Sequence, residues 1–278
     1  MSDQPPAPDQ TPAPAPEPAA PEWRSAWWRE LIIATKYLTR LRIPLRGLPD
    51  RAHIGGALAW FPLIGALVGA LGGLIDGVGI AILHLPSSIT SCFAVLGMMW
   101  LTRGLHEEQL AAFANQYGDL SDKNRRLGWL KEERAVRYGT IAIMFIILLR
   151  IAAIGSLDSV ELVLATLIAS GAWSHALMSV AAGWLRPADG DPVADHFGQP
   201  EPIRVLIALA LGATTMLAVM SAGAALAMLV SSLVTGAVIF MATRMFNGYY
   251  NGPLLGALQQ MTDLAVICAL VAAQTLGD

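Results

Sequence analysis

The stretch Arg103-Gly-Leu-His-Glu-Glu-Gln109 lies between two strongly apolar runs, Phe93–Leu101 and Ile141–Ile154. It opens a polar region, Arg103–Gly139, that holds a histidine, several carboxylates and seven Lys or Arg residues. This is the most polar region of the chain outside its N-terminal tail, and it holds groups that can bind ions or transfer protons. The stretch therefore predicts helices that cross a membrane, and it marks Arg103–Gly139 as the region where any chemistry takes place.

The composition indicates the same class of protein. Of the 278 residues, 55% are hydrophobic and 14% are charged, against about 25% charged in an ordinary soluble domain. The mean hydropathy is +0.53, and several apolar runs approach the roughly 20 residues that cross a bilayer core. We predict an all-α, polytopic helical integral membrane protein, with one membrane domain over residues 23–278, the lipid bilayer as its surroundings and no nucleic-acid partner.

The apolar runs predict about seven transmembrane helices. They cover Ile54–Leu83, Ser88–Leu101, Gly139–Ile154, Val160–Gly183, Ile203–Met220, Ala224–Met241 and Thr262–Leu276.

The N-terminal part divides into a tail and an interfacial helix. Seven of the sixteen residues from Pro6 to Pro21 are proline, and such a composition keeps residues 1–22 solvated and disordered. From Trp23 to Arg51 the chain is basic and aromatic, with apolar residues at helical spacing. This pattern predicts an amphipathic helix in the membrane interface that ends before Pro44.

The positive charges predict the orientation. All but one of the eighteen Lys and Arg residues fall in four polar segments, and three short connections contain none. Because cytoplasmic loops carry the excess of Lys and Arg, we place the N-terminus and these four segments in the cytoplasm. The four segments are the region before Ala52, Arg103–Arg137, Arg186–Arg204 and Arg244–Gln260.

Two features inside the spans have both a packing and a functional interpretation. Glycines recur every four residues from Gly65 to Gly77, which gives either a strip for close helix packing or a groove for a substrate. Arg150 lies within a span, where a charge needs a partner or a wet cavity. Asp76 is a conceivable partner, and a catalytic role for Arg150 is the alternative.

A further polar segment, Arg244-Met-Phe-Asn-Gly-Tyr-Tyr-Asn-Gly-Pro253, precedes the last predicted span. Its two Asn-Gly pairs and its proline predict a turn or a re-entrant structure. Arg244, together with the backbone of Asn251 and Gly252, could hold a phosphate. A tight turn between two spans is the alternative.

Seven short motifs follow one another along the chain. They are Tyr37-Leu-Thr-Arg-Leu-Arg-Ile-Pro44, Phe61-Pro-Leu-Ile-Gly65, Gly104-Leu-His106, Lys131-Glu-Glu-Arg134 with Gly139, Leu148-Leu-Arg150, Trp173-Ser174 and Asn251-Gly-Pro-Leu-Leu-Gly-Ala257. In this order and at these separations, the chain resembles the cobalamin synthase family, whose members are adenosylcobinamide-GDP ribazoletransferases. The resemblance runs from about Leu31 to Val271, and it is far more specific than any single motif.

The resemblance implies a transferase of adenosylcobalamin biosynthesis in the bacterial inner membrane. Family members join α-ribazole, or its 5′-phosphate, to adenosylcobinamide-GDP, release GMP and depend on Mg²⁺. A ribose hydroxyl attacks the cobinamide-linked phosphorus, so the site must orient that hydroxyl and gather cations around the pyrophosphate. The catalytic residues that the resemblance implies are His106, Glu108, Lys131 and Arg134, and the substrate- or phosphate-binding residues are Arg244, Asn251 and Gly252.

The family's acidic motif, His-x-Asp-Gly-x-x-Asp-x-x-Asp, is altered in this chain. His106 matches the histidine, but the three acidic positions, which share one helix face, fall on Glu108, Ala112 and Asn115. Asp119 would lie on the same face if the helix continues. We therefore predict a weakened Mg²⁺ site at Glu108, Asn115 and Asp119.

The same residues also have interpretations without catalysis. His106 could be an interfacial polar residue, and Lys131 and Arg134 could be topology signals. The chain could equally be a non-catalytic paralogue that binds a corrinoid or acts as a membrane scaffold. The sequence leaves this alternative open, and it leaves a homo-oligomer open as well.

Overall fold

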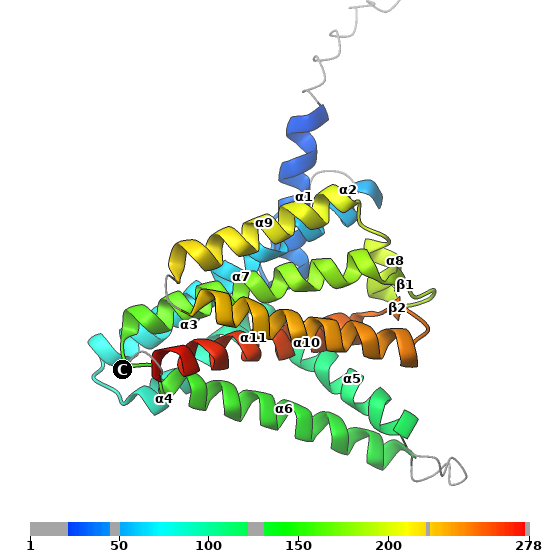
Figure 1. Ribbon diagram of the computed structural model, residues 1–278. Helices are drawn as coiled ribbons and strands as arrows, with labels where there is room; N and C mark the ends of the chain where they lie inside the picture. Colours follow the sequence, from blue (N-terminus) through cyan, green and yellow to red (C-terminus); the bar gives the residue numbers. More distant parts are fainter. Residues whose placement is uncertain (1–21, 45–50, 122–130, 221–222, 276–278) are drawn as a thin grey trace, which may run out of the picture.

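The computed structural model describes residues 22–44, 51–121, 131–220 and 223–275; the side chains of residues 22–26, 51–53, 117–121 and 131–137 fall outside this description. Figure 1 shows a bundle of long helices. The elements are α1 (Glu22–Leu38), α2 (Arg51–Gly56), η1 (Ala57–Trp60), α3 (Phe61–Ala81), α4 (Ser87–Thr102), α5 (Leu105–Ser121), α6 (Lys131–Gly155), α7 (Val160–Trp184), β1 (Arg186–Pro187), α8 (Pro192–Phe197), α9 (Pro202–Val219), α10 (Ala224–Met245), β2 (Tyr249–Tyr250) and α11 (Gly252–Thr275). The predicted helical membrane class is confirmed, whereas the predicted tail lies almost entirely outside the described residues.

Within the described residues, six helical segments are long and apolar enough to cross a membrane by themselves. They are Ile54–Ala81, Tyr138–Gly155, Val160–Trp184, Pro202–Val219, Ala224–Met245 and Gly252–Thr275. The sixteen-residue helix α4 qualifies only together with the first part of α5, which it meets at an angle of 88°. The predicted number of about seven is reached if this bent pair forms one span.

The glycine strip of α3 is a packing surface. A side chain added at Gly65 or Gly69 would collide with the backbone carbonyl groups of Gly171 and Leu167 in α7, and the next two glycines of the strip also face α7. Such close approach is how helices gain van der Waals contact in a membrane, where lipid is as apolar as the side chains. The packing interpretation is confirmed, and a groove along the strip is wrong because α7 fills it.

The N-terminal helix α1 is only partly interfacial. Figure 1 shows α1 running across the direction of the long helices, as an interfacial helix does. Its second half nevertheless belongs to the protein interior: Ala34 and Leu38 are fully buried in the largest hydrophobic cluster. The buried Glu30 also forms an ion pair of 2.9 Å with Arg204 of α9. This helix is therefore anchored by the bundle as well as by any membrane surface.

The last helix begins ten residues before the predicted start at Thr262, since α11 starts at Gly252. Asn251 Oδ1 accepts a hydrogen bond of 2.9 Å from the N–H of Leu254, which is the geometry of a helix N-cap. The predicted re-entrant structure is thus a short turn with strand β2, which pairs in parallel with β1. Gln259 and Gln260 fall in the predicted cytoplasmic segment Arg244–Gln260, but their side chains are buried inside the bundle.

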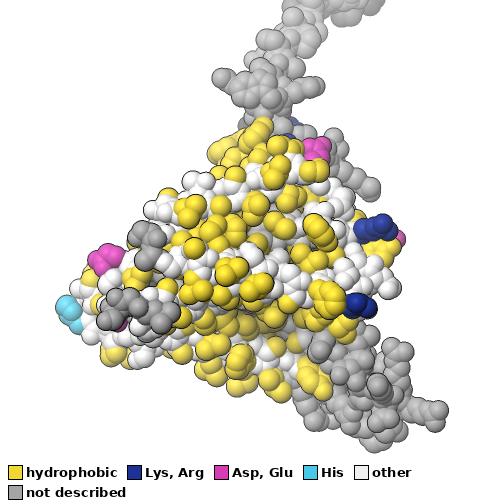
Figure 2. All heavy atoms as spheres, viewed as in Figure 1, with side chains coloured by type: hydrophobic (Ala, Val, Ile, Leu, Met, Phe, Trp, Pro, Cys, Tyr) yellow, Lys and Arg dark blue, Asp and Glu magenta, His cyan; other side chains and the backbone are white. Residues whose placement is uncertain are grey.

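The surface is mostly apolar, as expected of a surface that faces lipid, and basic residues lie at one end of it. Figure 2 shows apolar side chains over most of the visible face, with Lys and Arg at the end near β1 and β2. A histidine is visible at the opposite end, and acidic residues are visible at both ends.

Candidate functional site

A buried polar network joins α5, α6 and α11. Arg150 of α6 donates hydrogen bonds to Asp263 Oδ2 at 2.5 Å and to Gln260 Oε1 at 2.9 Å. Gln260 in turn donates to Glu107 Oε1 at 2.9 Å, and this oxygen lies 3.9 Å from Arg150 Nη1. Arg150, Glu107 and Asp263 are only 4%, 6% and 1% exposed. Charges at this depth require such partners, so the network holds three helices in one arrangement.

The suggested pairing of Arg150 with Asp76 is therefore corrected. Asp76 of α3 accepts a hydrogen bond of 2.5 Å from Thr90 Oγ1 of α4 instead. The partners of Arg150 come from helices that are remote in the sequence, and the separation from Asp263 is 113 residues. A contact between residues this far apart cannot be predicted from their spacing along the chain.

Two histidines extend the network to α7. His175 Nδ1–H donates to the carbonyl oxygen of Gly171 at 2.7 Å, and His175 Nε2 lies 3.3 Å from His106 Nε2. With both rings neutral, His106 donates the second hydrogen bond, and its own Nδ1 becomes an acceptor. This Nδ1 has no hydrogen-bond partner among the described residues, and the same holds for Glu107 Oε2 and Asp263 Oδ1.

A cavity of about 20 Å³ lies among these groups. A space of this size holds about one water molecule, provided that polar atoms surround it. The unpartnered atoms of His106, Glu107 and Asp263 line the cavity and satisfy that condition. The cavity is too small for any organic ligand in this conformation.

The bend between α4 and α5 sets which side chains face the network. Arg103 and Gly104 adopt the left-handed conformation, with φ of 60° and 66°, which ends α4 and lets α5 start in a new direction. His106 and Glu107 then point into the bundle, while the next residue, Glu108, is exposed. One motif thus supplies both an interior and an outer polar group.

The predicted magnesium ligands do not form a metal site among the described side chains. Glu108 is exposed, Ala112 has no ligand atom, and Asn115 Oδ1 accepts a hydrogen bond of 2.6 Å from the N–H of Gly139 in α6. Asp119 belongs to α5, but its side chain is not described. Within the described part of the chain, no group of three or more His, Cys, Asp or Glu residues could hold a metal. Mg²⁺ requires several oxygen ligands, and the described side chains do not supply such a set, so the magnesium site stays a prediction.

The predicted phosphate-binding residues lie at the turn between α10 and α11. Arg244 is exposed, and its guanidinium lies 5.2 Å from an aromatic ring of its own helix. The side chain of Asn251 caps α11, and the N–H of Gly252 donates to Asp191 Oδ1 at 3.1 Å. The backbone donor of Gly252 is therefore occupied, and the phosphate-binding role of the three residues stays a prediction.

The four predicted catalytic residues are not brought together among the described side chains. His106 faces the buried network and Glu108 faces outward. Lys131 and Arg134 belong to the first turn of α6, where side chains are not described. The roles of all four stay predictions.

Three residues of the network, Glu107, Gln260 and Asp263, were not predicted as functional. A signal for two of them was present, because Gln260 and Asp263 are three apart and share one helix face beside apolar residues. Polar residues with that spacing indicate a helix that buries a polar stripe, not a loop.

Comparison with known proteins identifies the fold family. A family model described as cobalamin-5-phosphate synthase matches residues 30–271. The chain belongs to this family. An adenosylcobinamide-GDP ribazoletransferase of Azorhizobium caulinodans is 30% identical to it over 251 residues, which covers 86% of the chain and 93% of the relative. Proteins with the same name from Allorhizobium ampelinum and Shewanella amazonensis are 33% and 28% identical, and the matches cover 90% and 89% of the chain and 98% and 97% of those proteins.

No solved structure matches the chain. The buried network, from Glu107 to Asp263, lies entirely within the region that matches the cobalamin-5-phosphate synthase family. The network is thus part of the family domain and not of an added segment.

Proposed function

We propose that this protein is a membrane transferase that joins α-ribazole, or its 5′-phosphate, to adenosylcobinamide-GDP and releases GMP. The observation that carries the proposal is the family match over residues 30–271, together with relatives of that name along almost their whole length. The helical membrane fold and the buried charged network agree with this function, since intramembrane ionisable groups mark functional sites by default.

The chemistry requires that a ribose hydroxyl forms a bond to the cobinamide-linked phosphorus while the bond from that phosphorus to the GMP oxygen breaks. The hydroxyl gives up its proton, and GMP leaves with the bond electrons. Of the motif positions at residues 108, 112 and 115, only Glu108 carries a carboxylate, and it is exposed. We assign Glu108 the contact with the attacking hydroxyl, because a carboxylate within hydrogen-bond reach can accept its proton.

His106 acts differently from Glu108 in this proposal. It is 3% exposed and its ring faces His175, so it positions α5 and does not touch the substrate. Magnesium dependence, which the resemblance implies, stays a separate proposal. We derive no step through the metal, because the described residues do not form a site for it.

The transferase activity is tested with the purified full chain in neutral lipid nanodiscs. GMP release is measured after addition of adenosylcobinamide-GDP and either α-ribazole or its 5′-phosphate, with and without Mg²⁺. We expect release with the wild type and a loss of about a hundredfold with Glu108→Gln, which is within the usual range for a general base. Glu161→Gln is the matched control, since Glu161 is an exposed glutamate in the first turn of α7.

A chain that binds adenosylcobinamide-GDP but releases no GMP under any of these conditions would be the non-catalytic paralogue. In that case the double change Ala112→Asp and Asn115→Asp restores the family carboxylates. Release of GMP by the restored chain would show that their loss had silenced it.

We propose that the protein lies in the bacterial inner membrane with its N-terminus in the cytoplasm. The one-sided distribution of Lys and Arg supports this orientation. Single cysteines at Ser87, Ser121 and Ser156, in a chain without Cys92 and Cys268, are labelled in intact cells with an impermeant thiol reagent. We expect labelling at Ser87 and Ser156 only, and labelling at Ser121 alone would reverse the orientation.

A further inference from the structure

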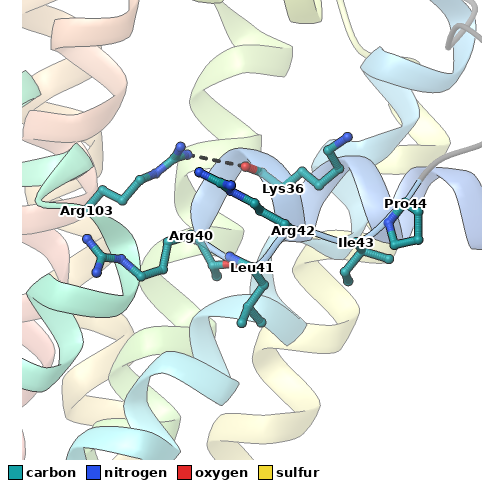
Figure 3. A pocket seen from close by; sticks show the side chains of 8 residues that line it. Lys36, Arg40, Leu41, Arg42, Ile43, Pro44 and Arg103 are labelled. Carbon is teal, nitrogen blue, oxygen red and sulfur yellow. Dashed lines mark hydrogen bonds between the residues drawn. The ribbon is translucent and has the colours of Figure 1, made fainter.

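Four basic side chains surround an open pocket of about 820 Å³ beside the end of α1. Figure 3 shows Arg40 and Arg42 extending from the segment after α1 toward Arg103, which comes from the end of α4. Lys36, in the last turn of α1, completes the set. The apolar side chains of residues 41, 43 and 44 form the remaining wall. The pocket has the size of an ordinary ligand site, which is about 300–1,000 Å³.

Backbone contacts hold the two halves of this basic pocket together. The N–H of Arg40 donates to the carbonyl oxygen of Leu101 at 2.8 Å. Arg103 Nη2 donates to the carbonyl oxygens of Lys36 and Tyr37 at 3.3 and 3.2 Å. The segment after α1 is therefore attached to the bend between α4 and α5, and the cations are held close to one another before any ligand arrives.

Part of this charge has an ordinary explanation. Lys36 and Arg103 lie at the C-terminal ends of helices, where cations are stabilised by the helix dipole. The guanidinium carbon of Arg40 lies 4.2 Å from the ring centre of Trp100, an exposed aromatic residue. These contacts explain the positions of individual basic residues, but they do not explain why four basic residues line one pocket.

The basic pocket has no internal counter-charge within the described residues. None of the four cations forms an ion pair with a described carboxylate, and no carboxylate is among the residues that line the pocket. All four side chains are exposed. Like charges gathered in this way repel one another, and an anion with more than one negative charge relieves the repulsion. Arg and Lys side chains are the groups that bind phosphate oxygens.

We infer that the basic pocket formed by Lys36, Arg40, Arg42 and Arg103 binds the pyrophosphate of the nucleotide-linked substrate. This inference rests on the proposed function, which supplies a substrate with a pyrophosphate. A pyrophosphate diester carries two negative charges, whereas a zwitterionic or singly anionic lipid headgroup has less charge to place among four cations. The apolar wall accepts the organic group attached to the phosphates. Arg103, which lines the pocket, lies at the bend between α4 and α5 and precedes Glu108 by five residues in the chain.

The test measures binding of inorganic pyrophosphate by calorimetry, with the full chain in nanodiscs of neutral phosphatidylcholine. We expect saturable binding that weakens as salt is raised, and a loss of about a hundredfold in the double variant Lys36→Gln and Arg42→Gln, or about tenfold for each charged contact. The matched control is Arg186→Gln, since Arg186 is exposed and lies outside the pocket. The variant Lys36→Arg with Arg42→Lys keeps the charge and should retain most of the affinity.

A second arm uses nanodiscs that contain anionic phosphatidylglycerol. If the wild type binds no pyrophosphate in neutral discs but retains labelled phosphatidylglycerol through Lys36 and Arg42, the pocket belongs to a lipid headgroup and the substrate assignment is overturned. Binding of pyrophosphate that is equal in the wild type and the double variant overturns the site itself.

Failure of this inference can be told from failure of the proposed function. GMP release with an unchanged KM for adenosylcobinamide-GDP in the double variant would refute the pocket and leave the transferase intact. Pocket-dependent pyrophosphate binding without GMP release would support the pocket and refute the transferase.

Discussion

Replacing Arg150 by glutamine should destabilise the protein strongly, whatever its activity. The change removes the only positive charge of the described network while Glu107 and Asp263 stay buried at 6% and 1% exposure. The short contacts to Asp263 at 2.5 Å and to Gln260 at 2.9 Å are lost together. Two carboxylates then remain without a cation in a place that water scarcely enters.

The size of the effect follows from the loss of one partner of a buried ion pair, which costs about 3–5 kcal/mol. At 2–4 °C for each kcal/mol, the thermal midpoint should fall by roughly 6–20 °C.

The assay compares thermal unfolding midpoints in one detergent, at one scan rate, because membrane proteins often unfold irreversibly. The triple variant Glu107→Gln, Arg150→Gln and Asp263→Asn removes the charges together and should recover most of the loss, as neutral replacements of buried ion pairs do. Arg186→Gln serves as the exposed control.

Two results would refute this reasoning. One is a midpoint for Arg150→Gln within about 2 °C of the wild type, less than 1 kcal/mol on the scale above. The other is a triple variant as unstable as the single one. Either result would mean that water or a second cation reaches the carboxylates.

Three further predictions concern packing, capping and pH. Gly69→Ala should lower stability by about 1–3 kcal/mol. In the control Gly236→Ala nothing lies within 4 Å of the added carbon, so that change should be neutral or slightly stabilising. Thermal unfolding midpoints test this, and equal effects of the two changes would contradict the packing of α3 on α7. Asp191→Ala removes the acceptor of three backbone N–H groups, including that of Gly252, and should lower stability by about 2 kcal/mol or more. Limited proteolysis of the variant should cut next to α8 first. A cleavage pattern equal to that of the wild type would contradict this prediction. Because burial raises the pKa of Tyr37 to about 12, the unfolded chain loses this proton first, so stability should fall between pH 10 and pH 12. Midpoints of the wild type and Tyr37→Phe over that range test this, and parallel curves would contradict it.

The parts of the fold that depend on local pattern could be predicted from the sequence. Most span boundaries agree within a few residues, because each span is long and apolar by itself. The packing of α3 was also accessible, since glycines at every fourth position share one face wherever the partner helix comes from. In both cases the signal lies within one helix.

The site depended on contacts between distant helices, and these could not be predicted. Arg150 was recognisable as a charge in need of a partner, but the choice between Asp76 and Asp263 is made by the packing of α6 against α11. The contact between His106 and His175 joins residues 69 apart. The segment that ends at Gln260 was interpreted as a loop. The side chains that hydrogen-bond to Gln260 come from distant parts of the chain, so the sequence around it does not show that it is buried.

The separation of 113 residues between Arg150 and Asp263 has a consequence for biosynthesis. At about 5–20 residues per second, the ribosome makes α11 roughly 6–20 s after Arg150. During that interval the guanidinium of Arg150, whose insertion at a helix centre is unfavourable by about 2.5–3.5 kcal/mol, lacks the hydrogen bonds to Asp263 and Gln260. Insertion of the last helix therefore supplies the closest partners of a charge in a much earlier helix. A chain truncated before Gly252 is an unfinished product that the membrane's quality-control proteases should remove.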